Sequence, residues 1–326
     1  VLWPHMMATT LIHAILFLWL LTPSGALRAT VVGGSGFVGS RVCKILVGTG
    51  AQVTSLSKSG RVPKWASGEE WTQSVDWKCI DLLEADAAAI DSAMGAPDSI
   101  VSCLGVVDSS AEVLRRGNGI ANVNAFASAR RAGVKRSVYV SVASEVAACE
   151  DGWLPFAKEE FSAYFAGKAM AEEAAVAAVN DATRTCIIKP SFIYGGETFE
   201  VPLPGKFVAP RVSSDYGYFV EEILSLGPIQ ALADVMPGLV KVALRPPSSV
   251  EAVATACAFA ASGELAKGQA TRRAVGTLDG TAAIKAAAGE VPPSGISDGL
   301  ERALDGIADL TQKLLDTIEA KIGGKK

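Results

Sequence analysis

The sequence predicts an α/β protein with a doubly wound parallel sheet and a small C-terminal cap. From Ala29 to Ile188, short β-rich runs alternate with helical stretches, the pattern of a parallel sheet covered by helices on both faces. The β-rich runs are almost entirely apolar, which is typical of strands buried on both sides. Beyond Gly195, repeated prolines interrupt the chain and the alternation ends, so this part is expected to form a cap.

The elements follow in order along the chain. Strands are expected at residues 30–32, 52–56, 77–80, 99–104, 137–141 and 185–188. Helices are expected at 37–47, about 84–94, about 119–132, about 161–179 and 250–260, the last returning from the cap to the sheet. The organisation is therefore an apolar leader at 1–26, a dinucleotide-binding domain at 27–195, a cap at 196–262, an Ala-, Gly- and Thr-rich linker at 263–295, and an amphipathic helix at 296–326.

The leader contains no Lys, Arg, Asp or Glu, and its apolar run from Leu11 to Leu21 is followed by small residues up to Ala26. This resembles a signal segment cleaved after Ala26, although the positive start of such a segment is missing. A retained anchor is the alternative, because the apolar run counted from Met6 approaches the roughly 20 residues of a membrane span.

Composition excludes several classes of function. The 326 residues carry 30 basic and 34 acidic side chains in no long run, so no nucleic-acid surface is expected. Both histidines, His5 and His13, lie in the leader, which excludes Ser-His-Asp catalysis and most histidine metal sites. The six cysteines form no C-x-x-C pair, so neither zinc nor a disulfide framework is predicted. We expect no metal.

A glycine-rich turn follows the first strand and opens a helix. It reads Gly33-Gly34-Ser35-Gly36-Phe37-Val38-Gly39 and satisfies G-x-G-x-x-G from Gly34. In this context the glycines permit a tight turn and close approach of a pyrophosphate, which the free N–H groups and positive end of the helix would bind. The turn predicts a dinucleotide site.

The end of the second strand indicates which dinucleotide binds. An NAD site usually has Asp or Glu there to hold the ribose 2′-hydroxyl. This chain instead has Ser57, Lys58 and Arg61, whose cations and hydroxyl suit a 2′-phosphate. The pattern favours NADP(H), and NAD(H) remains the alternative.

Tyr164 and Lys168 are four residues apart, so they share one face of the predicted helix. A nearby ammonium favours phenolate, so we expect it to lower the pKa of the phenol. Tyr164 is then a candidate acid or base toward a carbonyl or alcohol.

These motifs together resemble an atypical, extended short-chain dehydrogenase/reductase with an NAD(P)-binding Rossmann domain. The likeness covers about Thr30 to Ala261 and is strongest to organellar members: plant chloroplast proteins, fungal mitochondrial relatives and the nucleotide-binding accessory subunit of respiratory complex I. The segments that carry it are residues 33–39, Asp81-Leu82, 102–105, 133–141, 164–168 and 189–195.

The resemblance implies a role for each segment. Asp81 and Leu82 would border the adenine, and Lys168 would hold the nicotinamide ribose. The other cofactor-lining residues it implies are Cys103, Leu104 and Gly105 along the cofactor, and Pro190 and Ser191 at the carboxamide.

The chain departs from the family at the end of the fifth strand. The Ser or Thr that holds the substrate oxygen coincides with Val142 or Ala143, which leaves Ser141 and Ser144 as substitutes. The resemblance implies an NADP-dependent oxidoreductase or isomerase-like enzyme acting on a hydrophobic quinone or isoprenoid-like substrate in an organelle, a plastid before a mitochondrion. The alternative is a non-catalytic nucleotide-binding subunit or assembly factor, bound to a membrane surface or protein complex through the C-terminal helix.

Overall fold

The computed structural model describes residues 25–149, 158–196, 212–263 and 276–290. The predicted doubly wound sheet is confirmed: within these stretches seven parallel strands lie in the order β3-β2-β1-β4-β5-β6-β9. The strand order reverses between β1 and β4, and ligands of such sheets bind at that point. The strands are β1 (Arg28–Val32), β2 (Gln52–Ser57), β3 (Val75–Cys79), β4 (Ser99–Ser102), β5 (Arg136–Val140), β6 (Thr185–Lys189) and β9 (Gly276–Asp279).

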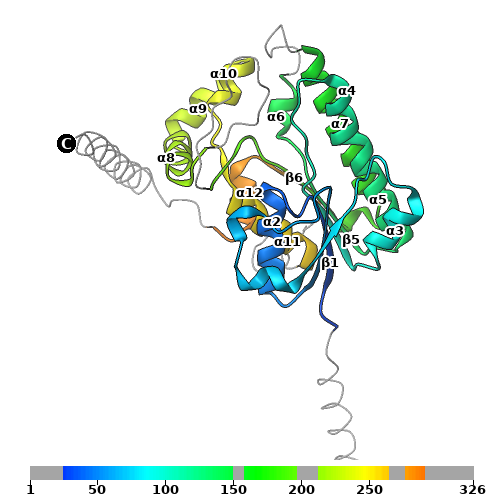
Figure 1. The fold of residues 1–326 in the computed structure, drawn as a ribbon. Coiled ribbons are helices and arrows are strands. Elements are labelled where there is room, and N and C mark those ends of the chain that lie inside the picture. The colour runs from blue at the N-terminus through cyan, green and yellow to red at the C-terminus, as the bar shows by residue number, and fades with distance from the viewer. Residues whose placement is uncertain (1–24, 150–157, 197–211, 264–275, 291–326) are drawn as a thin grey trace, which may run out of the picture.

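Helices cover both faces of this sheet (Figure 1). Successive side chains of a strand point to opposite faces, so Val31 packs in the core under α2 and α11 while Val32 packs in the core under α3, α5 and α7. The helices are α2 (Phe37–Gly48), α3 (Ala87–Met94), α4 (Ala111–Arg115), α5 (Ala121–Arg131), α6 (Ser144–Ala147), α7 (Lys158–Ala177), α11 (Val250–Ser262) and α12 (Thr281–Ala287). Within the described ranges, short 3₁₀ turns lie at Lys64–Ala66, Glu70–Ser74 and Ala182–Arg184.

The cap consists of α8 (Ser214–Leu224), α9 (Gly227–Val235), α10 (Gly238–Ala243) and the paired short strands β7 (Ile193–Tyr194) and β8 (Ser248–Ser249). In Figure 1 its three helices gather on the side of the molecule away from α3 and α5. Glu221 of α8 is fully buried, accepts a 2.8 Å hydrogen bond from the Tyr194 hydroxyl and pairs with Lys285 of α12. The cap is thereby tied to the last helix of the sheet, and α11 returns to the sheet as expected.

Two expectations are wrong in part. The linker expected at 263–295 contains β9 and α12, and β9 is the edge strand beside β6, with Ile187 opposite Thr277. Pairing with an open sheet edge outweighs the Ala- and Gly-rich composition that indicated a loop. The helix expected to begin near Gly119 is preceded by α4 and by one π-helical turn, Arg116–Ile120.

Most of the leader, and the C-terminal helix expected at 296–326, lie outside the described residues. Within the described stretches, no helix combines the length and the apolar character that crossing a membrane takes.

Candidate functional site

The glycine-rich turn joins β1 to α2 at close range. Gly33 has φ +77°, and its N–H donates to the Leu56 carbonyl at 2.8 Å. A Cβ at Gly34 would stand 2.3 Å from Ser55 Oγ, and a Cβ at Gly39 would stand 2.3 Å from the Gly33 oxygen. Side chains are therefore excluded by contact at Gly34 and Gly39, and the left-handed backbone disfavours one at Gly33. The predicted turn has the geometry that its glycines imply.

The start of α2 fits an anionic group. Gly36 is exposed at the N-cap, no side chain caps it, and no acidic residue stands in the first turn. The N-terminal N–H groups and the positive end of the helix are thus open to a phosphate, as the dinucleotide interpretation requires. The Phe37 ring lies under the Arg41 guanidinium at 4.9 Å, whereas Val38 is buried in the core.

Ser35 of the glycine turn lies beside the end of β2. Ser35 Oγ lies 2.9 Å from Ser57 Oγ and donates to the Arg61 carbonyl at 2.6 Å. Lys58 is paired, because its Nζ lies 2.9 Å from Asp81 Oδ2. Burial acts to raise the pKa of Asp81, but the Leu83 N–H and the Lys58 ammonium outweigh it and lower that pKa. The second strand ends without the Asp or Glu that is usual in NAD sites. Asp81, after the third strand, places a carboxylate beside that strand end instead.

A cavity of about 280 Å³ opens beside this pair, between the ends of β2, β3 and β4. Asp81 and Leu82 line it, as the resemblance implies for an adenine pocket, and so does Leu104. The remaining walls are largely apolar and include Val32, Leu56, Ile80, Leu83, Val106, Val113 and Ala121.

The segment after β4 lies against the glycine turn. Cys103 N–H donates to the Val32 carbonyl at 2.9 Å, and a Cβ at Gly33 would stand 3.2 Å from the Cys103 carbonyl carbon. A Cβ at Gly105 would stand 3.4 Å from Lys168 Nζ. Cys103 to Gly105 therefore connect the glycine turn to Lys168, which fits their expected place along the cofactor. We call the surface that runs from residues 33–39 past residues 103–105 to Lys168 the nucleotide groove.

Lys168 is buried at the other end of the groove. Its Nζ donates to the Val140 carbonyl at 3.1 Å and lies 5.7 Å from the centre of the Tyr164 ring. Burial lowers the pKa of Lys168 to about 8, although Cys103 and Glu172 act in the opposite direction. The predicted shared face of Tyr164 and Lys168 is confirmed, and the ammonium remains largely protonated at neutral pH.

The expected effect on Tyr164 is wrong. Burial raises the pKa of the Tyr164 phenol to about 12 instead of lowering it. Its ring packs edge-on to Phe165 at 5.4 Å and against an apolar cluster, so desolvation of the phenolate prevails over the attraction of the lysine. The phenol is protonated near neutral pH.

The two candidate serines are directed elsewhere. Ser141 is buried and its hydroxyl donates to Glu172 at 2.5 Å, while Glu172 also pairs with Lys189 at 2.9 Å. Ser144 is exposed at the start of α6, where its N–H donates to Asp279 Oδ1 at 3.1 Å. A serine that holds the substrate oxygen would be expected to lie in contact with Tyr164. Neither serine shows this contact.

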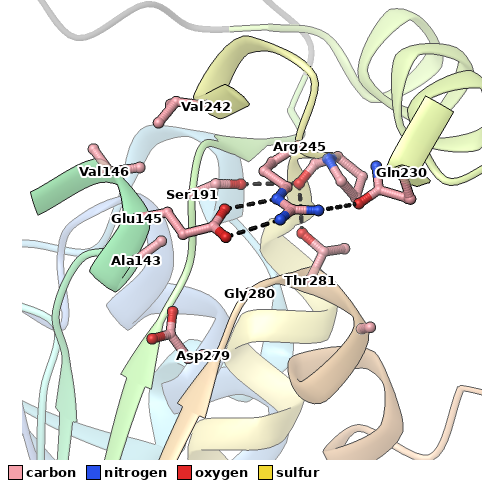
Figure 2. A pocket seen from close by; sticks show the side chains of 12 residues that line it. Ala143, Glu145, Val146, Ser191, Gln230, Val242, Arg245, Asp279, Gly280 and Thr281 are labelled. Carbon is pink, nitrogen blue, oxygen red and sulfur yellow. Dashed lines mark hydrogen bonds and ion pairs between the residues drawn. The ribbon is translucent and has the colours of Figure 1, made fainter. Parts of the chain in front are cut away.

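Pro190 and Ser191 follow β6. The Pro190 carbonyl accepts from the Ala143 N–H at 2.9 Å, and Ser191 Oγ donates to the Pro246 carbonyl at 2.9 Å. Ser191 lines a second cavity of about 300 Å³, bounded by segments of the sheet domain and of the cap (Figure 2). Three cavity-lining residues, Ala143, Val146 and Val242, belong to the apolar cluster that packs on Tyr164.

Sequence reasoning missed two buried asparagines that shape the groove. Asn118 lies in the π-helical turn, accepts from the Val106 N–H at 3.1 Å and donates to the Val106 carbonyl at 2.9 Å. Asn122 accepts from Ser102 Oγ at 2.5 Å and donates to the Leu104 carbonyl at 3.3 Å. Two asparagines four residues apart in a buried helix were the available signal. Glu172, four residues after Lys168, offered the same signal on α7.

Comparisons with known proteins agree with this geometry. The family model "NAD dependent epimerase/dehydratase family" matches residues 29–215. The chain is similar to the "Uncharacterized protein At1g32220, chloroplastic" of Arabidopsis thaliana, with 32% identity over 54% of this chain and 55% of that protein. It is also similar to a 4-hydroxy-2-methyl-3-oxo-4-farnesyl-3,4-dihydroquinoline-1-oxide ketoreductase of Stigmatella aurantiaca, with 27% identity over 52% of each chain. The chain thus spans about half the length of these relatives.

Among solved structures, the Bordetella bronchiseptica enzyme WbmH in complex with NAD⁺ matches with a TM-score of 0.47 and 13% identity over 73% of each chain. The family model covers more than half of the sequence and includes the glycine turn, the Tyr164–Lys168 pair and the segment after β6. The chain belongs to the NAD-dependent epimerase/dehydratase family, whose members are extended short-chain dehydrogenases/reductases.

Proposed function

We propose that this protein is an NAD(P)-dependent oxidoreductase that reduces a carbonyl group. The observation that carries the proposal is the Tyr164–Lys168 pair at the carboxyl end of β5, in the same groove as the glycine turn. Gly33 to Gly39 would hold the pyrophosphate, and Lys168 would hold the nicotinamide ribose. The dinucleotide, when bound, supplies the hydride.

The direction of reaction follows from the state of Tyr164. A phenol whose pKa is about 12 is protonated at neutral pH and can donate a proton to a carbonyl oxygen. The Lys168 ammonium, 5.7 Å from the ring centre, would stabilise the phenolate left after that transfer. Reduction suits this site better than oxidation, which needs Tyr164 as a base.

Tyr164→Phe tests the proposal. Removing a positioned acid should lower the turnover number by about 10²- to 10⁴-fold. NADPH affinity should stay nearly unchanged, and the free energy of unfolding should change by no more than about 1 kcal/mol, the size of one hydrogen bond. Tyr218→Phe, at a half-exposed tyrosine of α8, is the matched control. Turnover in Tyr164→Phe equal to that of the parent would disprove the role of this phenol.

A second candidate, a non-catalytic nucleotide-binding subunit, is favoured by one observation. Val142 and Ala143 carry no hydroxyl at the position where the family places one, and Ser141 donates to Glu172. Cells that lack the protein distinguish the two functions. Full rescue by Tyr164→Phe would support the subunit, and loss of rescue with folding and NADPH binding intact would support the enzyme.

The proposal includes a preference for NADP(H) over NAD(H). Ser57 and Arg61 support it, and so does Lys58, although its ammonium is shared with Asp81. Lys58→Asp combined with Arg61→Ala should abolish most of the difference between NADPH and NADH affinities, measured by titration of each dinucleotide. Equal or tighter binding of NADH by the parent protein would contradict the preference.

The proposed substrate combines a carbonyl with an apolar part of quinone or isoprenoid type. The described cap carries an apolar groove of about 180 Å³, and the Stigmatella relative is named for a farnesylated quinoline oxide. Residues lining the groove include Phe192, Ile193, Tyr216, Val220, Leu224 and Pro247. Comparing farnesylated and unsubstituted forms of one aromatic ketone would measure what this groove contributes.

The proposed location is an organelle, a plastid before a mitochondrion, which the chloroplastic Arabidopsis relative supports. A mature N-terminus near Leu27 would indicate cleavage after Ala26, whereas peptides spanning Ile12 to Trp19 would indicate a retained anchor. Deleting the residues after Gly295 should release the protein from membranes or its complex while nucleotide binding persists. Loss of folding would instead place the C-terminal helix in the core.

A further inference from the structure

The cavity beside Ser191 is enclosed by parts of the chain that are far apart in sequence. Figure 2 shows α6 on one side, the end of α10 above, Gln230 of α9 opposite, and the β9–α12 connection below. It has a volume of about 300 Å³ and adjoins the apolar cluster around Tyr164. If the proposed function is right, this is where a substrate would place the group next to its carbonyl.

The nitrogen donors on the cavity wall are almost fully used by the protein itself. Arg245 donates to both oxygens of Glu145 at 2.6 and 2.8 Å, to Asp234 at 2.8 Å and to Gln230 Oε1 at 2.8 Å. Gln230 Nε2 donates to the carbonyls of Leu224 and Leu244 at 2.5 and 3.1 Å. Four of the five guanidinium N–H groups and both amide N–H groups are therefore occupied.

The hydroxyl donors are used in the same way. Ser191 and Thr281 both donate to the Pro246 carbonyl, at 2.9 and 2.6 Å. Ser248 Oγ, 2.9 Å from Thr281 Oγ1, uses one lone pair of Thr281. The lone pairs that remain on Ser191 and Thr281 can only accept from a ligand. Among the described residues, the side chains that line the cavity therefore present acceptors and almost no free donors.

The charges around the cavity also favour a ligand that donates hydrogen bonds. Arg245 is balanced by Glu145, and this pairing lowers the pKa of Glu145 and raises that of Arg245. Asp279 remains: its Oδ1 accepts from the Ser144 N–H at 3.1 Å, and the carboxylate lies at the floor of the cavity (Figure 2). Lys241 also pairs with Glu145 at 3.1 Å, and Asp234, which pairs with Arg245 at 2.8 Å, offsets its charge, so Asp279 leaves the described residues around the cavity with a net negative charge.

We infer that this cavity binds a substrate group that is uncharged or cationic and donates hydrogen bonds, such as a hydroxyl or amine, and that it rejects carboxylates and phosphates. The inference rests on the proposed function for the reaction, but binding in the cavity can be measured without any turnover. Asp279 acts as a specificity-determining residue because its charge is not balanced by a cation on the cavity wall.

Three benzaldehydes with different para groups test this inference: hydroxymethyl, trimethylammonio and carboxylate. Reduction is followed with NADPH and with NADH, and binding of the three corresponding alcohols to the NADP⁺-loaded protein is measured by ligand-observed NMR. At low ionic strength the carboxylate compound should be about tenfold poorer in kcat/KM and in affinity, because its charge would face the exposed Asp279 carboxylate, and added salt should reduce this difference.

Asp279→Asn keeps an acceptor for the Ser144 N–H and removes the charge. It should reduce the discrimination to within about threefold, since the electrostatic part is lost. Asp76→Asn is the control, because Asp76 is exposed on β3, at the opposite edge of the sheet from β9. Melting temperatures confirm that both variants fold.

The outcomes separate the inference from the proposed function. Alcohol binding in the expected order without reduction would support the cavity and contradict the oxidoreductase. Reduction of all three aldehydes with equal kcat/KM would support the oxidoreductase and overturn the inference. Discrimination unchanged in Asp279→Asn, or no binding of any alcohol, would overturn it as well.

Discussion

The two ends of the nucleotide groove are built from different parts of the chain. At the phosphate end there is no room for a side chain: an added Cβ would stand 2.3 Å from Ser55 Oγ at Gly34 and 2.3 Å from the Gly33 oxygen at Gly39. At the nicotinamide end, side chains meet protein acceptors, with Lys168 on the Val140 carbonyl and Ser141 on Glu172. The phosphate end has no room for an added atom. The geometry of the nicotinamide end depends on which hydrogen-bond partner each side chain has.

This difference explains what sequence could predict. Glycines required by backbone contact leave a spaced motif, so the phosphate end is visible in the sequence. A side chain's partner leaves no such trace, because it depends on elements brought together only by folding. Substitutions at the two ends should therefore have effects on stability and dinucleotide affinity that differ in kind as well as in size.

The largest effect is expected for Gly39→Ala. Its Cβ would stand 2.3 Å from the Gly33 oxygen and 2.9 Å from Gly34 Cα, so α2 must move away from the turn. Overpacking of this kind costs about 1–3 kcal/mol of stability. Losing about 3 kcal/mol of binding energy would weaken dinucleotide affinity by about a hundredfold. Calorimetric titration and urea unfolding measure both quantities.

Gly48→Ala is the matched control on the same helix, because its Cβ would meet nothing within 4 Å. It should leave affinity unchanged and stabilise slightly, by up to about 1 kcal/mol. Normal dinucleotide binding by Gly39→Ala would mean that the close approach of helix and turn is not required.

We expect Lys168→Met to have an intermediate effect on stability, and this effect depends on pH. Burial lowers the pKa of Lys168 from 10.5 to about 8. Between these values the unfolded chain binds a proton that the folded protein does not, so stability should rise with pH across this window. Below pH 8 both states are charged and the cost of burial is fully present. The slope is at most about 1.4 kcal/mol per pH unit.

Urea unfolding at pH 7, 8, 9 and 10 measures this slope. In Lys168→Met the rise of stability with pH that comes from Lys168 should be absent. Lys44→Met, at an exposed lysine of α2, is the control that should retain it. Affinity of the parent protein for NADPH should decline above pH 8 as the ammonium is lost. Parallel pH profiles for the parent and Lys168→Met would show that burial does not perturb this lysine.

The smallest effect is expected for Asp81→Asn, which releases Lys58 from its ion pair. The freed ammonium should increase the preference for NADPH over NADH by about two- to fivefold, in line with the 0.2–1 kcal/mol of an exposed pair. Asp91→Asn, which breaks an exposed pair with Arg131 between α3 and α5, serves as the control. An unchanged ratio of NADPH to NADH affinities would mean that Lys58 does not contact the 2′-phosphate.

The doubly wound parallel sheet could be predicted from the sequence. So could the glycine turn and the shared helix face of Tyr164 and Lys168. It could not predict the raised pKa of Tyr164, because desolvation arises from an apolar cluster contributed by three separate segments. It also missed β9, since Gly276-Thr277-Leu278-Asp279 is too short to show a period and becomes a strand only beside β6. Asp279, which ends that strand, was hidden for the same reason.

The late position of β9 in the chain has a kinetic consequence. Its pairing with β6 joins Cys186 to Gly276, so loop closure over a long stretch must precede it, and non-local contacts of this kind form slowly. Among the described strands β9, like β3 at the other edge, has a single partner, so we expect β9 and α12 to be released more easily than the central strands. Native-state hydrogen exchange should show these amides opening before those of β1 and β4. Such an opening would dismantle the floor of the Asp279 cavity while the nucleotide groove stays folded.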